Sequence, residues 1–171
     1  MSSYVHVYTG NGKGKTTAAI GLAIRAVGAG KKVLFTQFVK GMKYSEIEAL
    51  ERFYDKITIK QFGRGCFIVR DAAPEDIECA QQGLKEVGED LSDGKYDLII
   101  LDEACIALYY KLFTVAELID VVKQRHEHVE VVITGRYAPD ELVEYADLVT
   151  EMREVKHYYT KGVDARDGIE R

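Results

Sequence analysis

The residues of this chain best suited to bind a charged ligand lie in the segment VYTGNGKGKTTAA, residues 7–19. Its alternating glycines let the backbone turn so that several N–H groups point inward at an anion. A common phosphate-loop pattern is G-x-x-x-x-G-K-[ST], and Gly14-Lys15-Thr16 matches the end of it. Thr9 stands where the pattern has its first glycine. We expect this departure to change the entry into the loop and not its capacity to hold phosphate, because the later glycines form the anion-binding turn.

The loop leads into a helix that starts near Lys15, so the positive end of the helix dipole adds to the attraction for phosphate. In this motif Lys15 reaches phosphate oxygens and Thr16 binds Mg²⁺, while Lys13 adds a positive charge at the mouth. An ordinary strand–turn–helix is the alternative, and the sequence context favours nucleotide binding over it. The residues expected to bind the nucleotide here are Thr9, Gly10, Asn11, Gly12, Lys13, Gly14, Lys15, Thr16 and Thr17.

A second element is the apolar segment YDLIILDE, residues 96–103, which ends in Asp102 and Glu103. Such a strand is how phosphate-loop proteins place carboxylates near Mg²⁺. Many buried strands end in an acid, so this pattern indicates a metal site only in combination with the phosphate loop. Together the two elements predict binding of ATP with Mg²⁺ or Mn²⁺. They do not choose a reaction, because phosphate loops serve hydrolases, kinases, motors and switches alike.

Strand-like and helix-like stretches alternate along the chain. The expected strands cover residues 4–10, 31–38, 56–63, 96–103, 129–136 and 147–159, and the expected helices cover residues 16–30, 45–54, 73–94, 114–126 and 138–146. Repeated strand–helix units predict one α/β domain over residues 1–171, with a three-layer, mostly parallel sheet and helices on both faces, as in RecA-like phosphate-loop NTPases. Ligands of such sheets bind beyond the carboxyl ends of the strands. The chemically informative residues fall there: 9–17, 37–41, 63–67, 102–103 and 134–137.

Composition limits the function further. The 171 residues carry a net charge of −5, which argues against a nucleic-acid binder, whose footprint is usually basic. The sequence has no apolar run long enough to span a bilayer and shows no signal peptide, so we expect a cytoplasmic protein. Cys66, Cys79 and Cys105 are widely spaced and form no C-x-x-C pair, which predicts reduced thiols and argues against a zinc ribbon.

Five segments cover most of the chain: YTGNGKGKTTAAIGLAIRAVGAGKKV, QFVKG, YDLIILDE, VVITGRYAPDELVEYADLVTEM and VKHYYTKGVDARDGIE. In this order they resemble the family of ATP:corrinoid adenosyltransferases, and TGR, ADLVTEM and KH…G…GIE are the most specific of their motifs. The resemblance implies that a Co(I) corrinoid attacks the 5′ carbon of ATP and releases triphosphate, in adenosylcobalamin biosynthesis or salvage. It also implies ATP bound in a reversed sense on the loop, a flavoprotein that supplies the reduced corrinoid, and a homodimer.

The resemblance also implies roles for single residues. Residues 11–17 would hold the triphosphate. Thr16 and Glu103 would bind the metal ion, and Asp102 would be the next candidate ligand. The implied catalytic set is Lys15, Thr16, Glu103 and Arg136.

Further positions have a role by this resemblance and an alternative without it. Arg136 of the TGR motif would contact phosphate or ribose, or be a surface arginine at a strand end. Gln37 and Lys40 would shape the nucleotide pocket, or belong to a solvated turn. The polar tail, residues 157–171, would cover the active site or reach a partner subunit.

The sequence departs from the best-known enterobacterial members after the third strand. There the glycine-rich loop continues with phenylalanine and tryptophan, which face the corrinoid and help to remove the lower axial ligand of Co(II). Here residues 62–68 read FGRGCFI, and the chain has no tryptophan. Phe67 is expected to take part of that role, or its loop packs on the sheet, and Cys66 is expected to be a bystander thiol. Tyr137 and Arg166 also differ, so the departure bears on corrinoid choice more than on adenosyl transfer.

Two other functions remain as alternatives. One is a small kinase or ATPase that acts by phosphoryl transfer. The other is a non-catalytic, nucleotide-dependent switch or corrinoid carrier. The phosphorus product separates them, because triphosphate indicates adenosyl transfer, ADP with phosphate indicates phosphoryl transfer, and no turnover indicates a switch.

Overall fold

The computed structural model describes residues 3–63 and 72–170, in which six strands form one sheet. The strands are β1 Val5–Thr9, β2 Val33–Phe38, β3 Ile57–Phe62, β4 Leu98–Asp102, β5 Glu130–Thr134 and β6 Leu148–Glu151. Their order in the sheet is β3-β2-β4-β5-β1-β6, and every pairing within the described ranges is parallel. The expected α/β fold is confirmed, with a sheet that is parallel throughout.

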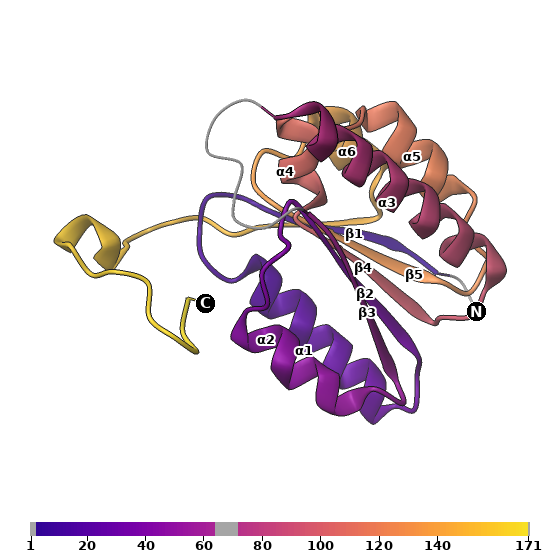
Figure 1. Cartoon of the computed structure of the whole chain (residues 1–171), viewed down its shortest axis with the longest axis horizontal. Coiled ribbons are helices and arrows are strands. Elements are labelled where there is room, and N and C mark those ends of the chain that lie inside the picture. Colours follow the sequence, from indigo (N-terminus) through magenta and orange to yellow (C-terminus); the bar gives the residue numbers. More distant parts are fainter. Residues whose placement is uncertain (1–2, 64–71, 171) are drawn as a thin grey trace.

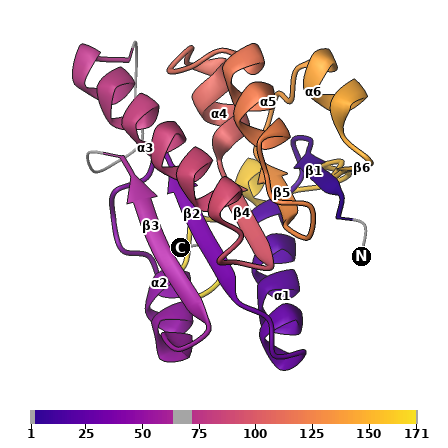
Figure 2. The same ribbon diagram turned by 90° about the vertical axis from the view of Figure 1, so that its right-hand side faces the viewer.

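Helices cover both faces of the sheet, which gives three layers (Figures 1 and 2). One face carries α1 Lys15–Gly28 and α2 Ser45–Leu50, which a 3-10 turn at Glu51–Phe53 continues. The other face carries α3 Pro74–Asp93, α4 Ala104–Tyr109, α5 Val115–Lys123 and α6 Asp140–Tyr145. Among the described residues, no helix has both the length and the apolar character needed to cross a membrane.

The central strands β2 and β4 are buried along their whole length, because helices cover both faces and other strands cover both edges. Successive side chains alternate between two hydrophobic clusters. Leu34 and Ile99 belong to the cluster under α3 and α5, whereas Phe35 and Ile100 belong to the one under α1 and α2. This double burial accounts for the near-continuous apolar run of residues 96–103.

Helix α1 has a buried face made only of alanines, namely Ala19, Ala23 and Ala26. Their spacing of three and four residues places them on one side of the helix. Because the side chains are small, the helix axis lies close to the sheet. This approach brings Thr16, in the first turn of α1, against the end of β4, where it bonds to Asp102.

Two elements differ from the sequence-based expectation. The pattern did not predict α4, which begins directly after β4 because Glu103 turns the chain in a left-handed conformation with φ 59°. The strand expected over residues 147–159 is wrong in extent, since β6 covers only Leu148–Glu151. β6 is an edge strand, exposed at all four residues and paired only with β1. Beyond it the chain leaves the sheet as an exposed arm, with one 3-10 turn at Tyr158–Lys161 (Figure 1).

Candidate active site

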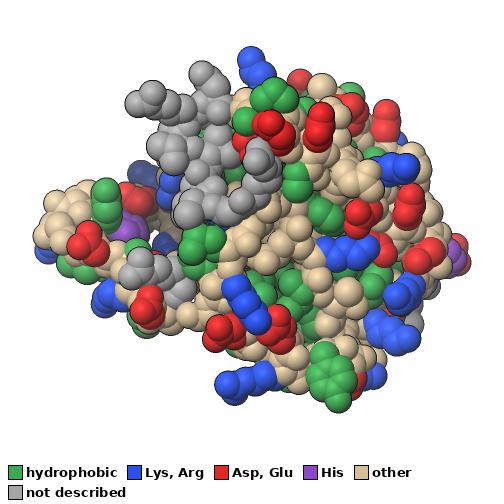
Figure 3. Space-filling view, in the orientation of Figure 1, with side chains coloured by type: hydrophobic (Ala, Val, Ile, Leu, Met, Phe, Trp, Pro, Cys, Tyr) green, Lys and Arg blue, Asp and Glu red, His purple; other side chains and the backbone are tan. Residues whose placement is uncertain are grey.

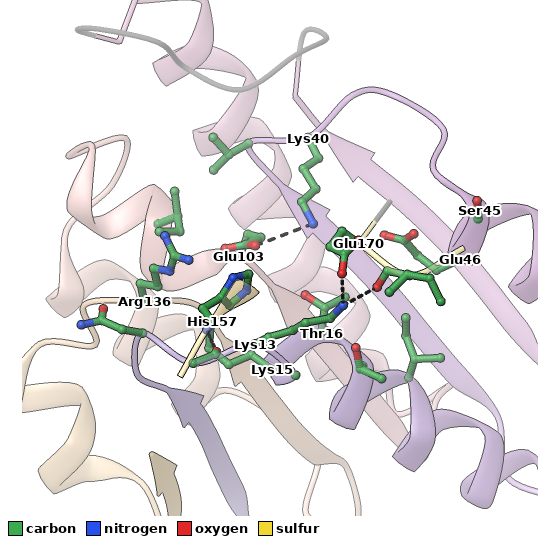
Figure 4. A pocket seen from close by; sticks show the side chains of 18 of the residues that line it. Lys13, Lys15, Thr16, Lys40, Ser45, Glu46, Glu103, Arg136, His157 and Glu170 are labelled. Atoms are coloured by element: carbon green, nitrogen blue, oxygen red, sulfur yellow. Dashed lines mark hydrogen bonds and ion pairs between the residues drawn. The ribbon is translucent and has the colours of Figure 1, made fainter. Parts of the chain in front are cut away.

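A cavity of about 1010 Å³ opens at the carboxyl edge of the sheet (Figure 4). Residues of the phosphate loop, of α2, of α4 and of the C-terminal arm line it. Among the predicted site residues, the cavity is lined by residues 11–17, Lys40, Glu103 and Arg136. The fold therefore brings these residues from four separate segments of the chain to one place.

The phosphate loop packs against the segment that follows β6. The Gly12 N–H donates a hydrogen bond of 2.6 Å to the Met152 carbonyl oxygen. A side-chain carbon at Gly12 would lie 2.7 Å from the same oxygen, so only glycine fits there. Thr9, the last residue of β1, accepts at its carbonyl from Met152 N at 2.8 Å and at its hydroxyl from Ala138 N at 3.3 Å. Thr9 thus ties the loop entry to two neighbouring segments.

Lys15 lies folded over the loop, with its Nζ donating to the Gly12 carbonyl at 2.7 Å. Burial lowers the pKa of Lys15, and the nearby positive charge of Arg136 lowers it further. Glu103 and Asp102 partly oppose this shift. A bound anion would stabilise both cations, so this part of the cavity is suited to phosphate.

Asp102 is fully buried and receives hydrogen bonds from three side chains. Its Oδ1 accepts from Thr16 Oγ1 at 2.8 Å and from Thr134 Oγ1 at 2.7 Å. Its Oδ2 accepts from Gln37 Nε2 at 3.1 Å. Gln37 in turn accepts from Gln61 Nε2 at 2.9 Å. These bonds cross the edge of the sheet through β5, β4, β2 and β3, and fix the carboxylate beside the first turn of α1.

Lys40 and Glu103 form the second charged group of the cavity, and Figure 4 shows them directed at each other. Lys40 Nζ lies 3.6 Å from Glu103 Oε1 and 3.8 Å from Asp102 Oδ2. Burial alone would lower the pKa of Lys40, but the carboxylates of Asp102 and Glu103 raise it. Burial raises the pKa of Glu103, as does the charge of Asp102, against the opposing effect of Lys40. Two carboxylates therefore share one half-buried lysine.

Three non-glycine residues with left-handed backbone lie just beyond central strands: Val39 with φ 65°, Glu103 with φ 59° and Tyr137 with φ 62°. Bulky and β-branched residues rarely adopt this conformation, and such strain is concentrated at functional sites. Lys40 follows Val39, and Arg136 precedes Tyr137. The strained positions thus set the direction of the chain at the charged residues of the cavity.

The C-terminal arm closes one side of the cavity through Lys13. Lys13 Nζ lies 2.7 Å from Glu170 Oε1 and 2.7 Å from the Ile169 carbonyl oxygen, as the dashed lines of Figure 4 mark. The Tyr158 hydroxyl lies 3.3 Å from the same Nζ and also bonds to Glu170. Arg166 lies over the Tyr158 ring, 4.9 Å from its centroid. Figure 3 shows this arm standing out from the body of the molecule, with a hollow between them.

Some predicted residues take positions other than the cavity wall. Gln37 is fully buried and reaches Asp102. Phe67 lies outside the described residues, as does Cys66. Thr16 donates a hydrogen bond to Asp102, the residue that the sequence analysis placed second to Glu103 as a metal ligand, and that order of the two ligands stays a prediction.

Thr134, which opens the TGR motif, was among the informative strand-end residues of the sequence, but no role was predicted for Gln61 or Tyr109. The Thr134 hydroxyl is a partner of Asp102. For Gln61, the sequence showed only a polar residue in a strand of alternating polarity, which does not indicate its contact with Gln37. Tyr109 lines the cavity from the end of α4, and missing that helix also meant missing this residue.

The cavity offers oxygen donors that suit a metal ion arriving with its ligand. No group of three or more His, Cys, Asp or Glu side chains gathers as a metal cage among the residues that the structure describes. Thr16 offers a hydroxyl and Glu103 a carboxylate at the cavity wall, and the buried carboxylate of Asp102 is bonded to Thr16. Mg²⁺ in nucleotide sites is usually held by one or two carboxylates, waters and substrate phosphates, so these residues fit an ion that arrives with ATP.

The sheet, the phosphate loop and the buried Asp102 define a nucleotide-binding protein of the phosphate-loop class. The whole chain, residues 1–171, matches the family described as ATP:corrinoid adenosyltransferase BtuR/CobO/CobP. A corrinoid adenosyltransferase of Sinorhizobium sp is 36% identical over 167 residues, which cover 96% of this chain and 78% of that protein. One of Escherichia coli K12 is 36% identical over 165 residues, covering 96% of this chain and 83% of that protein. The corrinoid adenosyltransferase CobA of Salmonella typhimurium is 37% identical over 166 residues, with coverage of 96% and 83%.

The chain belongs to the ATP:corrinoid adenosyltransferase family. It is an enzyme, and it transfers the adenosyl group of ATP to a corrinoid. The family resemblance inferred from the sequence is confirmed. Membership of this family favours adenosyl transfer over the two alternatives, phosphoryl transfer and a non-catalytic switch.

Proposed function

We propose that ATP binds with its triphosphate on residues 11–17 and its 5′ carbon toward a Co(I) corrinoid on the open side of the cavity. Co(I) supplies the electron pair of the new Co–C bond. The bond from the 5′ carbon to the triphosphate oxygen breaks, and the triphosphate leaves with the electron pair of that bond. The observation that carries this proposal is the convergence of Lys13, Lys15 and Arg136 on one cavity.

The main task of the site in this reaction is to stabilise the charge that develops on the leaving triphosphate. Burial, with a further effect of Arg136, lowers the pKa of Lys15, so a bound anion would stabilise the charged form of this lysine. Arg136 is exposed at the cavity, and its guanidinium makes no hydrogen bond to another residue in the ranges 3–63 and 72–170. Its donors are therefore available to phosphate oxygens.

A general base is not needed, because Co(I) is already a strong nucleophile. Cys105 is not suited to act as one. Burial, with a further effect of Glu103, raises the pKa of this thiol to about 12, so it stays protonated at neutral pH. The remaining requirement is to hold the 5′ carbon in line with the cobalt and the leaving oxygen.

We assign Mg²⁺ to Thr16 and Asp102, with Glu103 on the same side of the cavity. The ion, when bound, would neutralise negative charge on the triphosphate. Gln37 and Thr134 hold the Asp102 carboxylate in place for it. Lys40 would keep Glu103 oriented, since the two side chains form an ion pair.

Further parts of the proposal concern the arm and the partners of the enzyme. The arm, residues 157–170, covers the phosphate-loop side of the cavity, and Glu170 stays bonded to Lys13 until the triphosphate replaces it. By family resemblance, a flavoprotein supplies the Co(I) corrinoid, and the enzyme acts as a homodimer in the cytoplasm.

The test is an anaerobic assay with Mg·ATP and chemically reduced cob(I)alamin. We expect adenosylcobalamin and triphosphate in equal amounts. Arg136→Met should lower kcat/KM by about 100-fold, because it removes one group that stabilises the leaving charge. Arg52→Met is the matched control, since Arg52 is exposed on the 3-10 turn after α2 and does not line the cavity. Production of ADP in place of triphosphate would refute the proposal.

A further inference from the structure

Tyr109 and Tyr137 form a stacked pair at the rim of the cavity. Tyr109 is the last residue of α4, and Tyr137 follows Arg136. The ring centroids are 4.6 Å apart and the ring planes are inclined by 32°. Both residues line the cavity of the phosphate loop, and both also line a second hollow of about 560 Å³. The two rings are therefore a wall shared by two neighbouring hollows.

Core packing does not explain this pair. Tyr109 is 57% exposed and Tyr137 is 53% exposed. Tyr137 also has left-handed backbone, with φ 62°, which bulky side chains rarely adopt. Burial of an exposed ring contributes little stability to offset the backbone strain. Such strain is typical of positions that contact a ligand.

The cavity has two unlike sides on either side of the phosphate loop. The α2 side offers Ser45 and the carboxylate of Glu46, which can accept hydrogen bonds from an amino group such as that of adenine. The α4 side offers Ile106 and the rings of Tyr109 and Tyr137. Of the two substrates, the corrin macrocycle has the broader apolar face, and aromatic rings bind such faces by stacking.

The second hollow continues from the α4 side and mixes apolar and polar residues. Leu112 and Phe113 form part of its wall, while Gln81, Lys111 and Glu141 bring polar groups to it. A corrin macrocycle carries amide side chains around its rim, and such groups need both donors and acceptors. This hollow supplies both kinds of group within reach of the tyrosine pair.

We propose that the Tyr109–Tyr137 pair is the surface on which the corrin macrocycle rests, and that the second hollow receives amide side chains of its rim. This inference rests on a corrinoid being the acceptor of the adenosyl group. It makes the two tyrosines residues of corrinoid recognition, with no part in holding the triphosphate.

The experiment uses the full chain and four variants. Tyr109→Ala and Tyr137→Gly each remove one ring, and glycine suits the left-handed backbone at position 137. Tyr137→Phe keeps the ring as a conservative replacement. Tyr54→Ala is the control, because Tyr54 is 85% exposed and lines neither hollow. Binding of aquacobalamin is measured by equilibrium dialysis, and KM values for cob(I)alamin and ATP are measured separately, with Tm as a check of folding.

We expect Tyr109→Ala and Tyr137→Gly to raise the aquacobalamin Kd and the cob(I)alamin KM about tenfold, since loss of one stacking ring has an effect of this size. The KM for ATP should change less than twofold, and Tyr137→Phe and Tyr54→Ala should behave as the parent chain. A rise in the KM for ATP alone would assign the pair to adenine and overturn the proposal. An unchanged aquacobalamin Kd and unchanged KM values for both substrates would overturn it as well, because the pair would then have only a structural role. Because dialysis needs no turnover, it tests the pair even if the parent chain forms no triphosphate.

Discussion

Thr16 and Asp102 are joined by a hydrogen bond of 2.8 Å between Thr16 Oγ1 and Asp102 Oδ1, across 86 residues of sequence. The bond ties the first turn of α1 to the end of β4. Thr134 donates to the same Oδ1 and Gln37 donates to Oδ2 of this carboxylate. Asp102 is therefore the point at which the phosphate loop and the sheet meet.

Asp102→Asn tests this arrangement. The amide would place an N–H₂ group where a carboxylate oxygen now faces hydrogen-bond donors, so at least one buried bond is lost. We expect the free energy of unfolding to fall by about 1–3 kcal/mol. We also expect kcat/KM to fall by about 100-fold, because Asp102 would help to hold the Mg²⁺ that neutralises charge on the leaving triphosphate. Urea unfolding and the adenosyl-transfer assay measure the two effects. Asp120→Asn on α5, where the side chain is 71% exposed, should change neither.

Gly12→Ala tests the close contact between the phosphate loop and the segment after β6. The added carbon would lie 2.7 Å from the Met152 carbonyl oxygen and 2.9 Å from the Arg153 carbonyl carbon. Since both are backbone atoms, the loop has to move. We expect a loss of about 1–3 kcal/mol in stability and at least a tenfold rise in the KM for ATP.

The matched control for that change is Gly21→Ala in α1. Nothing lies within 4 Å of a side-chain carbon at Gly21. Alanine there should stabilise the protein by about 0.5–1 kcal/mol, because it favours the helix. Equal destabilisation by the two substitutions in urea unfolding would contradict the role given to the Gly12 contact.

The local patterns of the sequence predicted the parallel sheet and the phosphate loop, because each depends on short segments such as residues 7–19. The start of α5 is also local in origin, because Thr114 and Glu117 form a capping box there. What escaped prediction depends on contacts between distant segments. The partner of Thr16 is set by how closely α1 approaches β4, which no local pattern records.

The length of β6 and the position of Tyr109 were missed for similar reasons. A strand was expected to continue through residues 152–159, but within the described ranges β6 pairs only with β1, and β1 ends at Thr9, opposite Glu151. Helix α4 has only six residues, too few for a clear helical period. Its start depends on the left-handed turn at Glu103.

Glu103→Gln tests the cost of a buried charge at the site. Burial and Asp102 raise the pKa of Glu103 above 4.5, so the folded state favours the protonated acid. The stability contributed by this group is complete below pH 4.5 and is lost as the pH rises through the raised pKa. We therefore expect Glu103→Gln to raise the Tm at pH 7.5, and this gain to vanish below pH 4.5.

The same substitution should lower adenosyl transfer by about tenfold or more, because a charge at the site is lost. Glu89→Gln on α3 is the control, since Glu89 is exposed and distant from the cavity. A Tm that falls at pH 7.5 would show that the ion pair with Lys40 outweighs the cost of burying Glu103.

Glu170→Gln tests the contact between the arm and the phosphate loop. The hydrogen bond with Lys13 lowers the pKa of Glu170, so this contact is complete above pH 4.5 and is lost as the pH falls through the lowered pKa. At neutral pH the substitution should release the arm, and Lys13 should then be available to bind an anion. We expect trypsin to cleave after Lys161 and Arg166 several-fold faster, and inorganic triphosphate to bind several-fold more tightly, because Glu170 no longer competes for Lys13. Glu154→Gln, at an exposed position between β6 and the arm, should change neither rate nor affinity. If triphosphate binds Glu170→Gln more weakly than the parent chain, Glu170 supports the triphosphate site and does not compete with the ligand.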